Sequence, residues 1–321
     1  MEGKEWAKNL STTEASALYL LDFLFLPIPF YSVFLLERGE RGLYLLCMKK
    51  LLLFPLILAI ALSTSINAFA AKKTARKVAV QTYTFSQLPL DELIPVLKEV
   101  GADCIGASGG LKLSKKYPDV RFNPSMTDEQ KAYAHKLLKD AKIKVVSYGV
   151  VGSKTREDVE NLCKFAKEFD CPVIITEDKP EQFKFWDEIA PQYGVKMALH
   201  NHAYNSYKNA YFYPRLVEML IRPYKNVYAC ADNGHWIRSG LDTIEGHNIL
   251  KGKLQAIHFK DMNKAELNAH CVPFGKGVAN MKEVLKNLDE QGYDGYFVIE
   301  YEGTRHPVKE VKQCIEFLRN N

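Results

Sequence analysis

The segment Val227-Tyr-Ala-Cys-Ala-Asp-Asn-Gly-His235 begins as a short apolar run and ends in a cluster of polar side chains. The same order occurs in 197–202, 254–261 and 296–300, so the pattern returns at intervals of roughly 30 to 40 residues, the length of one strand–helix unit. Short apolar runs are typical of parallel strands, which are buried on both faces of a sheet. The spacing therefore predicts parallel strands that are connected by helices.

The rest of the chain continues this alternation. Apolar runs that predict strands lie at 78–83, 103–107, 145–150, 172–176, 196–200, 227–232, 254–260 and 295–300. Patterns that predict helices lie between and after them, at 90–100, 127–141, 154–169, 182–193, 214–221, 280–291 and 308–318. Thr127 is expected to cap the second of these helices. Eight predicted strands that alternate with helices predict a (β/α)8 TIM barrel. The main alternative is a doubly wound open sheet, but no Gly-x-Gly-x-x-Gly fingerprint follows the first predicted strand.

Residues 48–71 carry the features of a secretory signal peptide. Met48-Lys-Lys is a charged start, 51–62 is an apolar stretch, and the segment after it ends in the small-residue pattern Ala68-Phe-Ala. The apolar stretch is shorter than a membrane-spanning helix needs, which disfavours a transmembrane anchor. We therefore expect a periplasmic or secreted protein whose mature form has no stable membrane anchor.

The part of the chain before Met48 holds a second apolar stretch, at 17–36, which Asp22 and two prolines interrupt. We interpret 1–47 as an upstream extension from a misassigned start; a genuine extra membrane segment is the rival interpretation. Residues 72–321 have the typical length of one (β/α)8 barrel and can bury a single core.

Composition argues against nucleic acid as a partner, because the formal net charge of +5 is modest and no long basic run occurs. Six cysteines follow residue 72, and none of them forms a Cys-x-x-Cys pair. Most lie among apolar neighbours, so we expect buried free thiols, although a disulfide stays open. The sequence leaves oligomerisation open as well.

Side chains of the kinds that bind metals stand at the ends of the last four predicted strands. They are His200, Asp232, His258 and Glu300. The carboxyl ends of the strands of a (β/α)8 barrel converge on one face, where active sites lie. Imidazole and carboxylate groups together suit zinc, manganese and similar divalent ions. We therefore predict one divalent metal ion (Mn, Zn, Co or Mg) at the mouth of the barrel.

Five motifs in this chain resemble the xylose-isomerase-like sugar phosphate isomerase/epimerase family, which includes inosose dehydratases and is related to the endonuclease IV fold. The motifs are Leu199-His-Asn-His202, Asp232-Asn-Gly-His235, His258-Phe-Lys-Asp261, Phe274-Gly-Lys-Gly277 and Ile299-Glu300. The resemblance covers residues 78–318 and implies a single divalent metal held by the same four residues. It says little about which sugar is the substrate.

One position departs from the pattern of the ketose 3-epimerases in this family. They carry a Glu where this chain has His200, and that Glu acts with the Glu of the eighth strand as a pair of bases. Two carboxylates and two imidazoles leave the site of a divalent ion near neutral, which should make the ion a stronger Lewis acid. The missing carboxylate disfavours symmetric epimerisation by two Glu residues.

Two other residues are alternative bases. Glu177 follows the fourth predicted strand. The alternative is that it is an acidic loop residue that is exposed to solvent and has no catalytic role. His202 has an ordinary pKa near neutrality, and its bland interpretation is a residue that orients a metal ligand.

Several further side chains near the predicted strand ends are assigned to substrate. Lys260 is expected to meet a developing oxyanion or a hydroxyl group, with an ion pair to a neighbouring carboxylate as the alternative. His235 is assigned to substrate binding or to capping of the loop that it lies in. Trp236 and Tyr83 offer aromatic faces on which a sugar ring could stack, although packing is the commoner role of such residues.

These features predict a secreted, metal-dependent enzyme that removes a proton α to the carbonyl of a sugar or keto-sugar. Glu177 or His202 would remove the proton, while Glu300 and Lys260 would manage the developing charge and the return of the proton. Return of the proton gives isomerisation or epimerisation. Loss of a β-oxygen gives dehydration or cleavage of a keto-glycoside, which we expect ahead of epimerisation.

Two rival functions remain. A metal-dependent phosphodiesterase of the endonuclease IV type would favour more metal ligands and a basic surface, and neither is evident in the sequence. A non-catalytic sugar-binding barrel would bind no tightly held metal.

Overall fold

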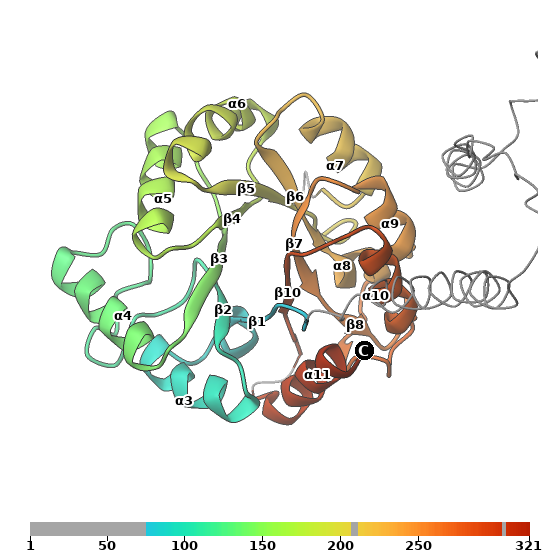
Figure 1. Ribbon diagram of the computed structural model, residues 1–321, viewed down its shortest axis with the longest axis horizontal. Helices are drawn as coiled ribbons and strands as arrows, with labels where there is room; N and C mark the ends of the chain where they lie inside the picture. Colours follow the sequence, from blue (N-terminus) through green and yellow to red (C-terminus); the bar gives the residue numbers. More distant parts are fainter. Residues whose placement is uncertain (1–74, 207–210, 304–305) are drawn as a thin grey trace, which may run out of the picture. The chain divides into compact units, whose positions relative to one another are not determined.

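The computed structural model describes residues 75–206, 211–303 and 306–321. Within them, eight parallel strands close into a barrel in which β1 pairs with both β2 and β10 (Figure 1). The barrel strands are β1 (Val78–Gln81), β2 (Cys104–Ala107), β3 (Lys144–Val151), β4 (Val173–Thr176), β5 (Lys196–His200), β6 (Val227–Asp232), β7 (Leu254–Phe259) and β10 (Tyr296–Ile299). The predicted (β/α)8 barrel is confirmed, and the open sheet is excluded. The predicted extension and signal, 1–47 and 48–71, lie outside the described residues.

Helices surround the barrel as an outer ring (Figure 1). They are α3 (Leu90–Val100), α4 (Asp128–Asp140), α5 (Arg156–Glu168), α6 (Pro180–Ile189), α7 (Pro214–Ile221), α8 (Asn233–Arg238), α9 (Thr243–Ile249), α10 (Met281–Glu290) and α11 (Val308–Asn320). The 3-10 turns η1 (Thr82–Phe85) and η2 (Ala190–Tyr193) follow β1 and α6, and β8 (Asp261–Met262) pairs with β9 (Cys271–Val272) as a small hairpin. None of the helices in the described part of the chain combines the length and the apolar character needed to cross a membrane.

The register of the strands brings the polar strand ends to one level. His200 pairs with Cys230, and Asp232 pairs with His258 on the next strand. Phe259 pairs with Ile299, so the residue after β10 stands opposite the residue after β7. The side chains predicted to bind a metal therefore reach the same face of the barrel.

The local structure after β6 differs from the prediction, because helix α8 begins at once where a loop was expected. Asp232 is its N-cap, and the carboxylate Oδ1 accepts a hydrogen bond from the His235 backbone N–H at 2.9 Å. The Asn-Gly dipeptide of this motif usually indicates a turn, which hid the helix. Strands β1 and β7 also end earlier than predicted, at Gln81 and Phe259.

All six cysteines of the described residues are buried and unpaired, as the sequence predicted. They are Cys104, Cys163, Cys171, Cys230, Cys271 and Cys314.

The first turn of α4 allows a test of the predicted role of Thr127 as a helix cap. Thr127 Oγ1 accepts from the Gln130 backbone N–H at 3.3 Å, and Gln130 Oε1 accepts from the Thr127 N–H at 2.9 Å, which together form a capping box. Thr127→Ala is expected to lower the free energy of unfolding by about 1 kcal/mol in denaturant titrations, because the Gln130 backbone N–H loses its side-chain acceptor. Thr127→Ser keeps the hydroxyl and should match wild type; equal losses in both variants would contradict the capping role.

Candidate metal and substrate site

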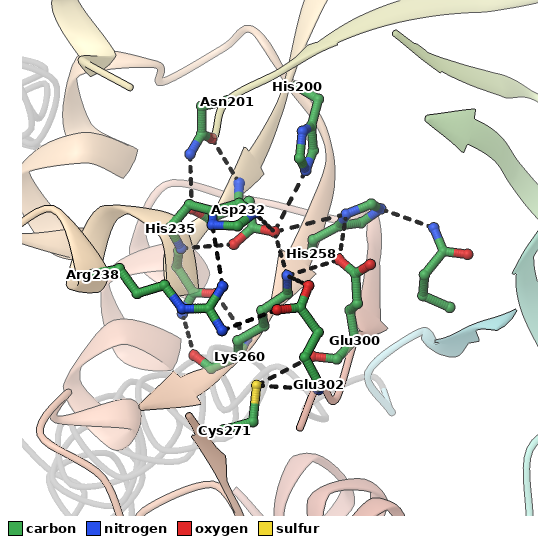
Figure 2. Close-up of polar contacts among 12 residues, drawn as sticks. His200, Asn201, Asp232, His235, Arg238, His258, Lys260, Cys271, Glu300 and Glu302 are labelled. Carbon is green, nitrogen blue, oxygen red and sulfur yellow. Dashed lines mark hydrogen bonds and ion pairs between the residues drawn. The ribbon is translucent and has the colours of Figure 1, made fainter. Parts of the chain in front are cut away.

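His200, Asp232, His258 and Glu300 meet at the carboxyl ends of β5, β6, β7 and β10 (Figure 2). All four residues are buried, and each offers one ligand atom within 4.8 Å of the others. The structure thus brings together the four residues that the sequence predicted as metal ligands.

The donor atoms of these side chains are arranged so that they could bind one metal ion. His200 Nε2, Asp232 Oδ2 and His258 Nδ1 are buried and make no hydrogen bond of normal geometry, although Asp232 Oδ2 lies 2.9 Å from Lys260 Nζ and His258 Nδ1 lies 3.0 Å from Glu300 Oε2. Asp232 Oδ2 lies 3.4 Å from His200 Nε2 and 3.9 Å from His258 Nδ1, so the three atoms face the same small space. Buried polar atoms without well-formed hydrogen bonds are costly, and a divalent ion could be coordinated by all three atoms. Two imidazoles and two carboxylates are also a donor set that divalent transition metals accept.

Glu177 orients one of these ligands. It follows β4 directly, and its Oε1 lies 2.8 Å from His200 Nδ1. A carboxylate on the outer nitrogen of a ligating imidazole fixes the ring and leaves the other nitrogen for the metal. Burial alone would lower the pKa of His200, but the hydrogen bonds and charges of Asp232 and Glu177 raise it to about 9. A proton and a metal therefore compete for His200 Nε2.

Asp232 divides its carboxylate between two tasks. Oδ1 caps α8 through the His235 N–H, and Oδ2 faces the other ligands and lies 2.9 Å from Lys260 Nζ. The cap fixes the rotation of the carboxylate, so the local turn from β6 into α8 directs Oδ2 toward the site.

Lys260 is a buried cation beneath the site. Its Nζ lies 2.9 Å from Asp232 Oδ2, 3.0 Å from Glu300 Oε2 and 2.8 Å from Glu302 Oε1. Burial alone would lower the pKa of Lys260, but these three carboxylates raise it well above its ordinary value. The ion pair that the sequence analysis gave as the alternative role of Lys260 is the one that the structure contains.

Glu302 and Arg238 extend this charge network (Figure 2), and the sequence analysis missed both. Glu302 Oε2 lies 2.9 Å from Arg238 Nη2, so its two oxygens join Lys260 to Arg238. Glu302 stands two residues after Glu300. Because side chains alternate along an extended chain, residues two apart face the same way, and this alternation could have identified Glu302.

A cavity of about 300 Å³ opens next to the four ligands. Its lining consists of Gln81, Tyr83, Ser108, Gly149, Val150, Glu177, His200, His202, His235, Glu300 and Glu302. The predicted base and substrate residues Glu177, His202 and His235 thus share one cavity with the ligands His200 and Glu300.

Two residues assigned to substrate are not in that lining. Trp236 is fully buried, and its ring packs against His247 at a centroid distance of 5.4 Å, so it belongs to the packing of α8 and α9. Lys260 is 1% exposed and lies beneath Glu300 and Glu302, so carboxylates separate its ammonium group from the cavity. The structure does not place either side chain against a substrate.

His202 and His235 form a stacked pair on the wall of the cavity. Their ring centroids are 3.9 Å apart with an interplanar angle of 29°. Burial lowers the pKa of His202 and holds that of His235 well below its ordinary value. Both imidazoles are therefore neutral near pH 7, and a neutral imidazole can accept a proton.

Gln81 is a further residue that the sequence analysis overlooked. Its Nε2 lies 3.3 Å from His258 Nε2 and donates to the Gly149 carbonyl oxygen at 3.2 Å. Gln81 is a polar residue at the end of the apolar strand β1. The four predicted metal ligands were recognised by the same position at a strand end, so this pattern could have identified Gln81 as well.

Asp261, in contrast, serves the backbone. Its Oδ2 accepts from the N–H groups of Gly275 and Gly277 at 2.9 and 3.0 Å. A Cβ at position 277 would lie 2.1 Å from Asp261 Oδ1, so glycine is required where this loop wraps the carboxylate. This contact explains why the His258-Phe-Lys-Asp261 and Phe274-Gly-Lys-Gly277 motifs occur together.

Comparison with known proteins agrees with this architecture. An inosose dehydratase from Geobacillus thermodenitrificans (strain NG80-2) is 27% identical over 160 residues, which are 42% of this chain and 51% of the relative. The chain spans about half the length of the curated relatives that it matches.

Solved structures extend the likeness over most of the chain. An uncharacterized protein from Parabacteroides distasonis ATCC 8503 is 26% identical with a TM-score of 0.62, covering 76% of this chain and 98% of that one. A sugar phosphate isomerase/epimerase from the same organism shares the fold at 16% identity, with a TM-score of 0.59 over 78% of this chain and 98% of that one. The model of the xylose isomerase-like TIM barrel family matches residues 94–321, and the chain therefore belongs to that family.

Proposed function

We propose that this protein is a metal-dependent enzyme that removes the proton α to the carbonyl of a sugar or keto-sugar. The observation that carries the proposal is the convergence of four buried side chains, His200, Asp232, His258 and Glu300, whose ligand atoms lie within 4.8 Å of one another, beside a cavity that contains a neutral imidazole. Acid–base groups next to a metal site are the groups that metal-assisted proton abstraction requires. Membership of the xylose isomerase-like family supports a sugar as the substrate.

The charges around the site support a divalent ion. Glu177, Asp232, Glu300 and Glu302 carry four negative charges, and Lys260 and Arg238 carry two positive charges. A metal ion bound at His200 Nε2 would displace the proton that the raised pKa favours there; with the imidazoles neutral, an excess of two negative charges remains, which one divalent ion would balance. His200, Asp232, His258 and Glu300 would hold this ion, and when bound it supplies Lewis-acid polarisation of a carbonyl oxygen. Mn, Zn, Co and Mg all stay candidates.

We assign the role of base to His202. Glu177, the other candidate, already accepts a hydrogen bond from His200 Nδ1, so its main task is to orient that ligand. His202 lines the cavity, and its ring is held flat against His235. Glu300 lines the same cavity and stays ionised, because Lys260, 3.0 Å from its Oε2, holds the pKa of the carboxyl below its ordinary range despite burial.

A single base suits elimination better than symmetric epimerisation. The proton leaves on one side of the substrate, and a β-oxygen substituent can then depart. The relative named inosose dehydratase is a member of the elimination class. We therefore place dehydration or keto-glycoside cleavage ahead of epimerisation.

The cavity also has an apolar lip. Tyr83 and Val150 line it and are 54% and 38% exposed, and both come from the β1–β3 side of the barrel. The charged lining comes from β4, β5, β6 and β10. Such a divided wall suits a sugar that carries an apolar face or substituent away from its carbonyl.

Two other functions have less support. A phosphodiesterase of the endonuclease IV type favours a multinuclear site, whereas the described residues form one four-residue cluster of possible ligands. A non-catalytic sugar-binding barrel gives no reason for four buried side chains whose possible ligand atoms converge within 4.8 Å.

Metal content tests the site directly. Purified wild-type protein should carry one divalent ion per chain, and Asp232→Ala or His258→Ala should lose it by elemental analysis with an unchanged circular dichroism spectrum. His270→Ala, which removes an exposed histidine away from the cluster, is the matched control and should keep the ion. Stoichiometric metal in the Asp232 or His258 variant would refute the ligand set, and a metal-free wild type would favour the non-catalytic barrel.

The base is tested with keto-sugars and keto-glycosides in deuterated water. Wild-type protein should place solvent deuterium on the carbon α to the carbonyl, as read by NMR. His202→Gln should slow this exchange by about 10²–10⁴-fold without changing metal content. Glu177→Gln should instead weaken metal affinity by about 10–100-fold, because His200 loses its orienting partner. If His202→Gln exchanges at the wild-type rate and Glu177→Gln keeps its metal but does not exchange, Glu177 is the base.

Export is part of the proposal. A mature chain isolated from the periplasm or the medium of an expressing bacterium should begin at Ala71 or Lys72 by N-terminal sequencing, because the small-residue pattern ends there. Retention of Glu2 or other residues of 1–47 in the isolated protein would overturn the signal peptide.

A further inference from the structure

Two buried asparagines stand beside the ligand positions of neighbouring strands. Asn201 follows His200 at the end of β5, and Asn233 follows Asp232 at the end of β6. Their exposed fractions are 2% and 0%, so neither side chain can bond to bulk water. Both amides must find their partners within the protein.

Each amide bonds both backbone groups of one residue on the next strand. Asn201 Nδ2 donates to the Asp232 carbonyl oxygen at 2.9 Å, and its Oδ1 accepts from the Asp232 N–H at 2.7 Å (Figure 2). Asn233 Nδ2 donates to the Lys260 carbonyl oxygen at 3.0 Å, and its Oδ1 accepts from the Lys260 N–H at 2.8 Å. A peptide group of a neighbouring strand would make the same two bonds.

These bonds begin where strand pairing stops. The pairing of β5 with β6 ends at His200 and Cys230, two residues before Asp232. The pairing of β6 with β7 ends at Asp232 and His258, two residues before Lys260. The side-chain amides therefore continue the ladder by one step in both places, at the level where the barrel opens.

We infer that Asn201 and Asn233 are positioning residues of the metal site. Asn201 fixes the backbone from which the Asp232 carboxylate projects. Asn233 fixes the backbone of Lys260, whose ammonium group holds the carboxylates of Asp232 and Glu300 at 2.9 and 3.0 Å. Because Asp232 is a ligand and Lys260 is not, metal affinity depends more on Asn201 than on Asn233.

This inference rests on the metal site of the proposed function and not on the reaction. Its test is the dissociation constant of Mn²⁺ and Zn²⁺ for the metal-depleted full-length protein, measured by calorimetry or by competition with a chelator. Asn201→Ala should bind about 10–100-fold more weakly than wild type, as is typical when a residue that supports a ligand is removed. Asn233→Ala should show a smaller loss of the same sign.

Asn226 provides a matched control at the other end of β6. Its Nδ2 donates to the Asp187 carbonyl oxygen at 3.1 Å, far along the strand from the ligands. Asn226→Ala should lower thermal stability and leave metal affinity at the wild-type value. A loss of affinity in Asn226→Ala equal to that in Asn201→Ala would reduce the effect to general destabilisation and overturn the inference.

Asn201→Asp covers the case in which the alanine variant does not fold. It preserves the shape and the acceptor for the Asp232 N–H but replaces the donor to the Asp232 carbonyl. Its added negative charge alone would strengthen the binding of a cation, whereas loss of positioning weakens it. Weaker binding supports the inference, and unchanged or tighter binding overturns it. If wild-type protein itself binds neither ion, the metal site and this inference fail together, while wild-type affinity in Asn201→Ala removes only the inference.

Discussion

The carboxylate of Asp232 has no exposure to solvent, and the arrangement of the barrel mouth follows from the need to compensate its charge. A buried charge without partners would cost several kcal/mol. Here one oxygen caps α8, and the other faces Lys260 and the imidazoles of His200, His235 and His258. The pKa of Asp232 lies well below its ordinary value, because the nearby cationic groups outweigh its burial. A carboxylate that is always ionised and held from several directions is a suitable anchor for a metal ion.

The same constraint explains the second layer of charge. Lys260 compensates two ligand carboxylates at once, but its own burial then requires Glu302, and Glu302 in turn contacts Arg238 of α8. Strands β6, β7 and β10 and helix α8 are thereby joined through side chains as well as through the sheet. The predicted near-neutral site, counted from two carboxylates and two imidazoles alone, omitted this layer.

Local sequence predicted the strands and the meeting of the four polar side chains at their ends, because both depend on short-range patterns. The bounds of β5 and β6 are as predicted, and so is the meeting of their terminal His200 and Asp232 with His258 and Glu300. The sequence pattern was less informative about side chains whose position depends on contacts between distant segments. Trp236 follows a strand end but turns into the packing against His247, because α8 starts at once. Arg238 and Glu302 lie in different elements, and no local periodicity links them.

The buried thiols of the barrel bear on where this protein can work. Burial raises the pKa of the Cys163, Cys171 and Cys314 thiols to about 12, so almost no thiolate forms near neutral pH. Since the thiolate is the species that attacks disulfides, burial protects these sulfurs from thiol–disulfide exchange. In an oxidising compartment, these three thiols would therefore react slowly for as long as the barrel stays folded.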